Sequence, residues 1–241
     1  MTNTRIYDWP REHWTITNSR FYLRPGNLGS TSPYTGQRSP YGPQVQFWVG
    51  EFTLSAKGEA HWRELSARVS VLGGISGLLR IPDIGRLVPA YDLEVDPTVE
   101  FWSDGTYWTD GTGWESGFLP PYVVIDVAAA RGDTSVVMRA LPVSIERCLR
   151  MGDLFEIRPS GIPAEHGHLY EVANDVRTDA DGKARVYFNP PLRAGVAAGD
   201  QVVLRAPMSV FRLAGDQEGI VNRDVNRHGR LGFTLIEELP R

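Results

Sequence analysis

The 241-residue chain has a single cysteine, no long apolar run and no excess of positive charge. One cysteine excludes an internal disulfide framework, and no stretch approaches the roughly 20 apolar residues of a membrane-spanning helix. The opening residues, MTNTRIYDWPREHW, lack the apolar segment of a secretory signal. The net charge of −4 and the pI of about 5.8 are not those of a nucleic-acid binder. We therefore expect no nucleic-acid partner, no membrane insertion and synthesis in a reducing cytoplasm.

The usual short motifs of enzymes are also missing. The sequence contains no Gly-x-Ser-x-Gly elbow, no HExxH helix and no Walker or GxGxxG loop. Among five histidines the one cluster is Glu165, His166 and His168, and no third metal ligand follows at a recognisable spacing. No pair of carboxylates stands out as acid and base. We therefore expect no catalytic residue, cofactor or metal, and interpret Cys148 as a buried small apolar residue.

The residues that are present predict a mainly β globular protein. Hydrophobic content is 41%, and the 25 glycines and 17 prolines favour many turns and short strands. One convincing helix is predicted at about 58–72, where Trp62, Leu65, Val69 and Leu72 form an apolar stripe that ends before two glycines. Strands are predicted within 5–24 and 45–55, and in GLLRIPDIG. Residues 122–142 read as two strands joined by a turn at Arg131-Gly132-Asp133, a tripeptide for which a tight turn is favoured over an integrin ligand.

The second half predicts a small inserted barrel. Four or five short strands separated by Gly-Asp and Asp-Gly turns occupy residues 143–206. SVFRLAGDQ and GFTLIEEL are then expected to return to the first sheet. The predicted division is therefore a ring-forming β domain of residues 1–142 with 207–241, and a barrel domain of residues 143–206.

The segment FWSDGTYWTDGTGWESG, residues 101–117, repeats tryptophan every six residues with a [Ser/Thr]-Asp-Gly-Thr unit between. The carboxylate spacing does not fit a calcium loop of the EF-hand type. Two interpretations stay open: an apolar patch or subunit interface, and a platform for sugar rings. The candidate residues are Trp102, Asp104, Trp108, Asp110 and Trp114. The Pro/Gly/Ser-rich stretch 25–44 is expected to be an extended arm or loop, and its Tyr34 and Tyr41 are further interface or ligand candidates.

The order of these features resembles the distal tail protein family and its relatives, tail-tip proteins of long-tailed bacteriophages. In the family pattern, a Trp-bearing strand leads to a helix closed by a glycine turn. A Gly-Asp-x-aromatic-x-Ile strand, an Asp-Gly turn and Pro-Pro-Leu-Arg follow. The matching positions, spread over residues 14–213, are Trp48, Trp62, Leu72 through Gly77, Gly152, Asp153, Phe155, Ile157, Val172, Asp181, Gly182, Pro190, Pro191, Leu192 and Arg193. The segment RPSGIPAEHGH departs from the pattern by lengthening the hairpin after Ile157.

The resemblance implies a structural virion protein. Its fold would be a β-sandwich or split-barrel belt domain with one packed helix, plus the inserted barrel. Its copies would form a ring, hexameric or else trimeric, that joins the tail tube protein to the hub, the receptor-binding parts and other baseplate proteins. It would assemble in the host cytoplasm and reside at the tail tip. The alternative is a carbohydrate-binding module of a tail tip that uses the tryptophan repeat.

Overall fold

The computed structural model is mainly β, as the sequence predicts. It describes residues 6–8, 16–25, 28–31, 33–35, 38–41, 46–57, 59–94, 98–100, 114–116, 118–160, 167–216, 221–223 and 228–239. The chain divides into two units, residues 1–85 with 208–241, and residues 86–207. The chain thus leaves the first unit once and returns to it.

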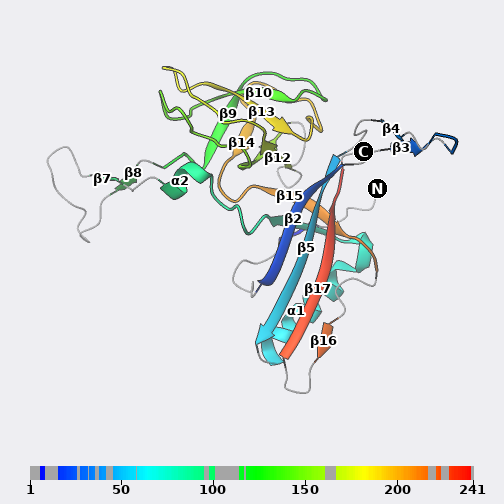
Figure 1. Ribbon diagram of the computed structural model, residues 1–241. Coiled ribbons are helices and arrows are strands. Elements are labelled where there is room, and N and C mark those ends of the chain that lie inside the picture. The colour runs from blue at the N-terminus through cyan, green and yellow to red at the C-terminus, as the bar shows by residue number, and fades with distance from the viewer. Residues whose placement is uncertain are drawn as a thin grey trace. The chain divides into compact units, whose positions relative to one another are not determined.

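The first unit contains a seven-stranded mixed sheet with the order β1-β6-β15-β17-β5-β2, to which β16 adds by pairing with β17. Its longest strands, β2, β5 and β17, lie side by side in Figure 1. The pairing of β1 with β6 is parallel and the remaining pairings are antiparallel. The elements are β1 (Ile6–Asp8), β2 (Ile16–Pro25), β5 (Gln46–Lys57), α1 (Glu59–Leu72), the 3-10 turn η2 (Gly74–Ser76), β6 (Leu78–Pro82), β15 (Met208–Leu213), β16 (Val221–Arg223) and β17 (His228–Glu237).

Aromatic side chains dominate the buried face of this sheet. The Phe21 ring stacks on Trp48 with centroids 5.3 Å apart and meets the edge of Phe211 at 5.6 Å. Along β17, Phe233, Leu235 and Glu237 are buried while the residues between them are only partly buried. The two faces of β17 therefore differ in burial. β17 pairs with β15 and β5, so SVFRL and GFTLIE both lie in the first sheet.

The predicted helix is confirmed as α1, Glu59–Leu72, with an i,i+4 ion pair of 2.7 Å between Glu64 and Arg68. Leu72 is buried and Val69 partly buried, whereas the side chains of Trp62 and Leu65 lie outside the described set. The expectation of one helix was incomplete, because a short second helix, α2 (Ala90–Glu94), precedes the barrel. Apart from β3 and β4, the described strands of the first unit form one sheet, so the structure supports a mainly β class.

The second unit contains a closed barrel with the order β10-β13-β12-β11-β14-β9. Its core includes the rings of Phe155, Tyr170 and Phe188, whose centroids lie 5.0 to 5.6 Å apart. On β13, buried and exposed residues alternate strictly. The strands are β9 (Tyr122–Val127), β10 (Ser135–Arg139), β11 (Leu154–Arg158), β12 (His168–Val172), β13 (Ala184–Asn189) and β14 (Gln201–Val203).

The barrel begins earlier than the predicted 143–206, because the hairpin of β9 and β10 belongs to it. The four strands β11 to β14 have the order β13-β12-β11-β14 and leave two unpaired edges. β9 pairs with β14, β10 pairs with β13, and the two pair with each other. A barrel must close to satisfy its edge strands. The hairpin that we assigned to the first domain supplies that closure, so the predicted boundary at residue 142/143 is wrong for these two strands.

Candidate functional site

Two short two-stranded sheets stand apart from the main sheet and the barrel. One is β3 (Leu28–Thr31) with β4 (Arg38–Tyr41), and the other is β7 (Thr98–Glu100) with β8 (Trp114–Ser116). The first pair lies within residues 25–44, and in the second pair β8 lies within residues 101–117 while β7 directly precedes them. We call them the first and the second hairpin, and both are labelled in Figure 1.

The first hairpin extends the ribbon formed by β2 and β5. These strands pair antiparallel as far as Pro25 opposite Gln46, and pairing resumes with Leu28 opposite Tyr41 and Thr31 opposite Arg38. Two residues on one side and four on the other separate the two ladders. The stretch expected to be an extended arm or loop therefore carries strand pairing of its own, in a register shifted by two residues from that of β2 and β5.

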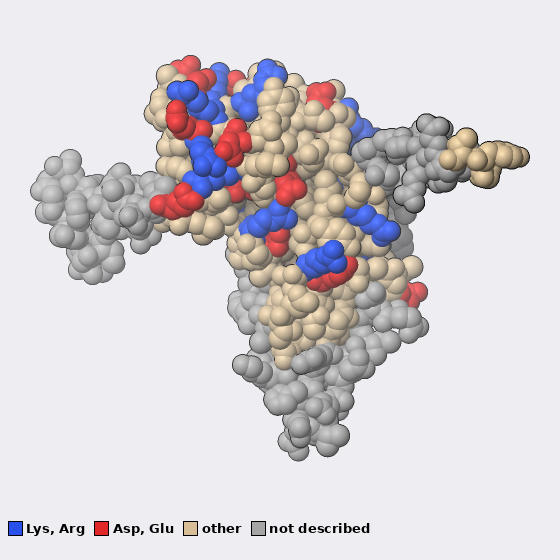
Figure 2. Space-filling view, viewed as in Figure 1, with Lys and Arg blue, Asp and Glu red and all other residues tan. Residues whose placement is uncertain are grey.

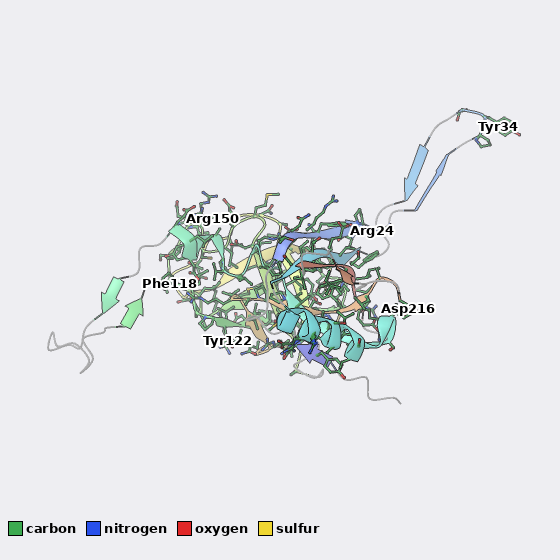
Figure 3. All side chains as sticks on the ribbon, turned by 90° about the horizontal axis from the view of Figure 1, so that it is seen from below. Arg24, Tyr34, Phe118, Tyr122, Arg150 and Asp216 are labelled. Atoms are coloured by element: carbon green, nitrogen blue, oxygen red, sulfur yellow. The ribbon has the colours of Figure 1, made fainter. Side chains whose placement is uncertain are left out.

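Tyr34 lies in the turn of the first hairpin and is 97% exposed. Figure 3 labels it at the far end of the β3–β4 ribbon. The other tyrosine candidate, Tyr41, is the residue of β4 opposite Leu28, and its side chain is outside the described set. An isolated two-stranded ribbon is marginally stable in water, and an exposed aromatic ring at its tip adds apolar surface without adding support.

The second hairpin brackets the tryptophan repeat. Glu100 pairs with Trp114 and Thr98 with Ser116, so the ladder closes directly around residues 101–113. Of the predicted site residues, Trp102, Asp104, Trp108 and Asp110 lie outside the described residues. Trp114 is placed only by its backbone pairing.

The second hairpin is rooted on the barrel unit by a buried carboxylate. Asp92, in α2, accepts a 2.7 Å hydrogen bond at Oδ1 from the backbone N–H of Leu119. This hydrogen bond thus joins the segment before the second hairpin to the segment after it. Arg205 Nη2 lies 3.0 Å from Asp92 Oδ2, and the same guanidinium lies 5.1 Å from the ring centre of Phe118. Asp92 before the second hairpin and Phe118 after it therefore both contact Arg205.

The helix that carries Asp92 is itself fixed to a barrel turn. Asp153 accepts a 2.9 Å hydrogen bond at Oδ1 from the Ala90 N–H, at the first residue of α2. At the other end of the helix, Arg150 binds Glu94 through two hydrogen bonds. These bonds lower the pKa of Glu94 and raise that of Arg150. Burial raises the pKa of Asp153, although its backbone hydrogen bonds act in the opposite direction.

A Gly-Asp turn occurs three times in the barrel with the same geometry. The glycine has a φ between 93° and 96°, a region that favours glycine. The aspartate Oδ2 accepts a hydrogen bond of 2.7 or 2.8 Å from the backbone N–H three residues earlier. The turns are Ala130–Asp133, Arg150–Asp153 and Ala197–Asp200. The first contains the Arg-Gly-Asp tripeptide, so the expected tight turn is confirmed by the local bonding of Asp133.

The described residues offer no metal cluster. Among them, no group of three His, Cys, Asp or Glu side chains is placed to share an ion. His168 is buried on β12, while Glu165 and His166 lie outside the described residues. Cys148 is fully buried, as predicted, and burial raises the pKa of its thiol to about 11.

Charges on the visible face of the molecule are interleaved rather than segregated (Figure 2). A depression of about 710 Å³ on the barrel is lined by Arg177, Lys183 and Arg185, with Asp179 among them. Lys183 is engaged with Asp126 at 2.9 Å. Residues 86–207 contain 11 Lys and Arg against 18 Asp and Glu. This depression is therefore a mixed-charge surface on an acidic unit.

No family model matches this chain, and no curated protein matches it. Among the described residues, no helix is long and apolar enough to span a membrane.

The sequence singles out the two stretches but predicts no hairpin in either, and it gives no sign of the contacts at the base of the second one. Asp92 and Arg205 are separated by more than 100 residues, and neither belongs to a motif. The recurring Gly-Asp pairs are predicted as turns. Aspartate side chains often accept a hydrogen bond from the backbone of their own turn, so sequence chemistry could also have predicted that bond.

Proposed function

We propose that this protein is a structural component of a phage tail tip, a ring former of the distal tail type and not an enzyme. The observation that carries the proposal is the pair of separate two-stranded hairpins, each outside the main sheet and the barrel. Hairpins of this kind suit contacts with a neighbouring copy. The resemblance in motif order supplies the identity of the assembly.

Ordering an arm costs conformational entropy. Fixing the backbone of one residue costs about 1–2 kcal/mol, and the turn of the first hairpin is exposed, with Tyr34 at 97%. Such a ribbon becomes stable when a partner covers it. An aromatic ring buries about 150–250 Å² when covered, so tyrosine and tryptophan residues on the hairpins would offset much of that cost.

In this proposal the first unit is the belt domain, of sandwich or split-barrel type, and the barrel is its insertion. Six copies, or else three, close a ring between the tail tube protein and the hub, the receptor-binding parts and other baseplate proteins. Assembly takes place in the host cytoplasm and the product is part of the virion. The rooting of the second hairpin by Asp92 and Arg205 supports an arm whose base must stay fixed under load.

Two matched deletions test the proposal. Replacing residues 26–45 by Asn-Gly joins Pro25 to Gln46 through a two-residue turn, and replacing residues 101–113 by Asn-Gly does the same between Glu100 and Trp114. We expect the full-length protein to form rings and each variant to shift toward the monomer in light scattering. Circular dichroism should show that both variants stay folded, with a loss of β signal in the first variant no larger than the removal of β3 and β4 explains. Rings that persist in both variants would refute the role of the hairpins.

The second candidate is a carbohydrate-binding module of a tail tip. It is favoured by three tryptophans spaced six residues apart in the sequence, of which Trp102 and Trp108 come between β7 and β8 and Trp114 is the first residue of β8. Trp108→Ala separates the two functions. Loss of binding on a glycan array with unchanged oligomeric mass would support the module, and loss of oligomer without any glycan binding by the original protein would support the interface.

A further inference from the structure

An apolar groove of about 310 Å³ lies in the first unit and is lined by residues of α1, of the edge strand β1 and of its neighbour β6. Its apolar lining comes from Tyr7, Ala67, Val71, Leu72 and Leu79. Leu72 and Leu79 are buried beneath it, whereas Val71 is 58% exposed at the mouth. The groove is large enough for one aromatic side chain.

The rim of the groove is polar and carries hydrogen-bond acceptors. Asp8 pairs with Arg80 at 2.7 Å and Glu64 pairs with Arg68 at 2.7 Å, and three of these four side chains line the groove. The carboxylate of Asp8 is 63% exposed. A buried tyrosine needs a partner for its hydroxyl, and these carboxylates are suitable acceptors. Tyr22 already donates to Glu51 in this way, at 2.9 Å.

We infer that the groove receives Tyr34 from a second copy of this chain. This inference rests on the proposed ring and names the surface that accepts its first arm. Tyr34 is the most exposed large apolar side chain of the described residues. Residues 28–41 carry one charge, that of Arg38, and no carboxylate. A weakly basic arm thus meets a groove lined by two carboxylates and one guanidinium.

The sheet order makes this contact head-to-tail. The arm starts from β2 and β5 at one edge of the main sheet, and the groove lies at β1 and β6 at the other edge. Tyr34 is 97% exposed, so it does not occupy the groove of its own chain. A knob on one edge and a socket on the opposite edge form a heterologous interface, which yields a ring when the rotation closes.

A disulfide trap tests the contact. Tyr34→Cys and Val71→Cys are combined in the full-length chain and oxidised with copper phenanthroline. The native Cys148 does not compete, because it is fully buried and its thiol pKa is about 11. The matched control combines Tyr34→Cys with Val143→Cys, a valine of the barrel that is 59% exposed. We expect a ladder of covalent oligomers with Val71→Cys and none beyond a dimer with Val143→Cys.

A second measurement compares the self-association of the original protein with that of Tyr34 variants that contain no added cysteine. Tyr34→Ala should weaken self-association roughly 10- to 100-fold, because an aromatic side chain loses its buried environment. Tyr34→Phe should weaken it less than about 10-fold, because only the hydroxyl contact is lost.

The outcomes separate this inference from the proposed ring. Rings in the original protein without a Tyr34–Val71 ladder would overturn the inference and leave the ring standing. A fast-migrating monomer with an internal disulfide would overturn the second copy as the occupant. A protein that is monomeric at every concentration and gives no ladder would overturn both.

Discussion

Replacing Asp92 by alanine should loosen the root of the second hairpin. The carboxylate is nearly fully buried, accepts the Leu119 N–H at 2.7 Å and lies 3.0 Å from Arg205. Alanine removes both contacts and leaves the Leu119 N–H without an acceptor in a position that is 1% exposed. Asparagine can keep the Leu119 hydrogen bond and loses only the charge.

The magnitude follows from these two contacts. A buried donor left unsatisfied costs about 1–3 kcal/mol. The ion pair with Arg205, which is 37% exposed, adds no more than about 1 kcal/mol after solvent screening. Removing a buried charge recovers part of its desolvation cost. We expect Asp92→Ala to lower the free energy of unfolding of the barrel unit by about 2–3 kcal/mol, and Asp92→Asn by about 1 kcal/mol.

Hydrogen exchange read by mass spectrometry reports the effect locally. Peptides that contain Leu119 should exchange faster in Asp92→Ala and close to normally in Asp92→Asn. The matched control is Asp126→Ala, which removes a barrel carboxylate that binds Lys183 but accepts no hydrogen bond from Leu119. Equal exchange at Leu119 in Asp92→Ala and Asp126→Ala would refute the reasoning.

Two further predictions concern the barrel. Burial raises the pKa of the Cys148 thiol to about 11 from an ordinary 9.0, so its stabilising contribution is complete below pH 9 and is lost as the pH rises to 11. The difference in unfolding free energy between the original protein and Cys148→Ala, measured by urea titration, should shrink by up to about 2.7 kcal/mol over this range. A difference that stays constant would contradict this prediction. Gly199→Ala should cost about 1 kcal/mol, because a Cβ there meets nothing within 4 Å and only the positive φ opposes it. Gly182→Ala should cost more, because its Cβ would lie 2.3 Å from the Leu141 carbonyl oxygen, and equal thermal shifts for the two variants would show that this close approach relaxes freely.

The sequence predicted the elements whose signals are local. The helix at Glu59–Leu72 follows from an apolar stripe and a glycine stop, and the alternation of Phe233, Leu235 and Glu237 follows from the period of a strand. The Gly-Asp turns are also recognisable, because glycine adopts a positive φ without steric cost and the aspartate side chain hydrogen-bonds the backbone of its own turn. These features need no knowledge of distant partners.

The parts that escaped prediction depend on long-range pairing. Nothing in YVVIDV or SVVMR indicates that β9 pairs with β14, 77 to 81 residues later, so the predicted start of the barrel is too late. The same holds for Asp92 and Arg205, which come together only when the barrel has closed. The short helix α2 was missed because five residues give too little periodicity to stand out.

The ring is tested most directly by the mass of the purified full-length protein in light scattering, with negative-stain images of the same sample. We expect a mass six times, or else three times, the 26.9 kDa of one chain, and particles with a central hole. A single species of 26.9 kDa at every concentration, without annular particles, would contradict the proposed ring.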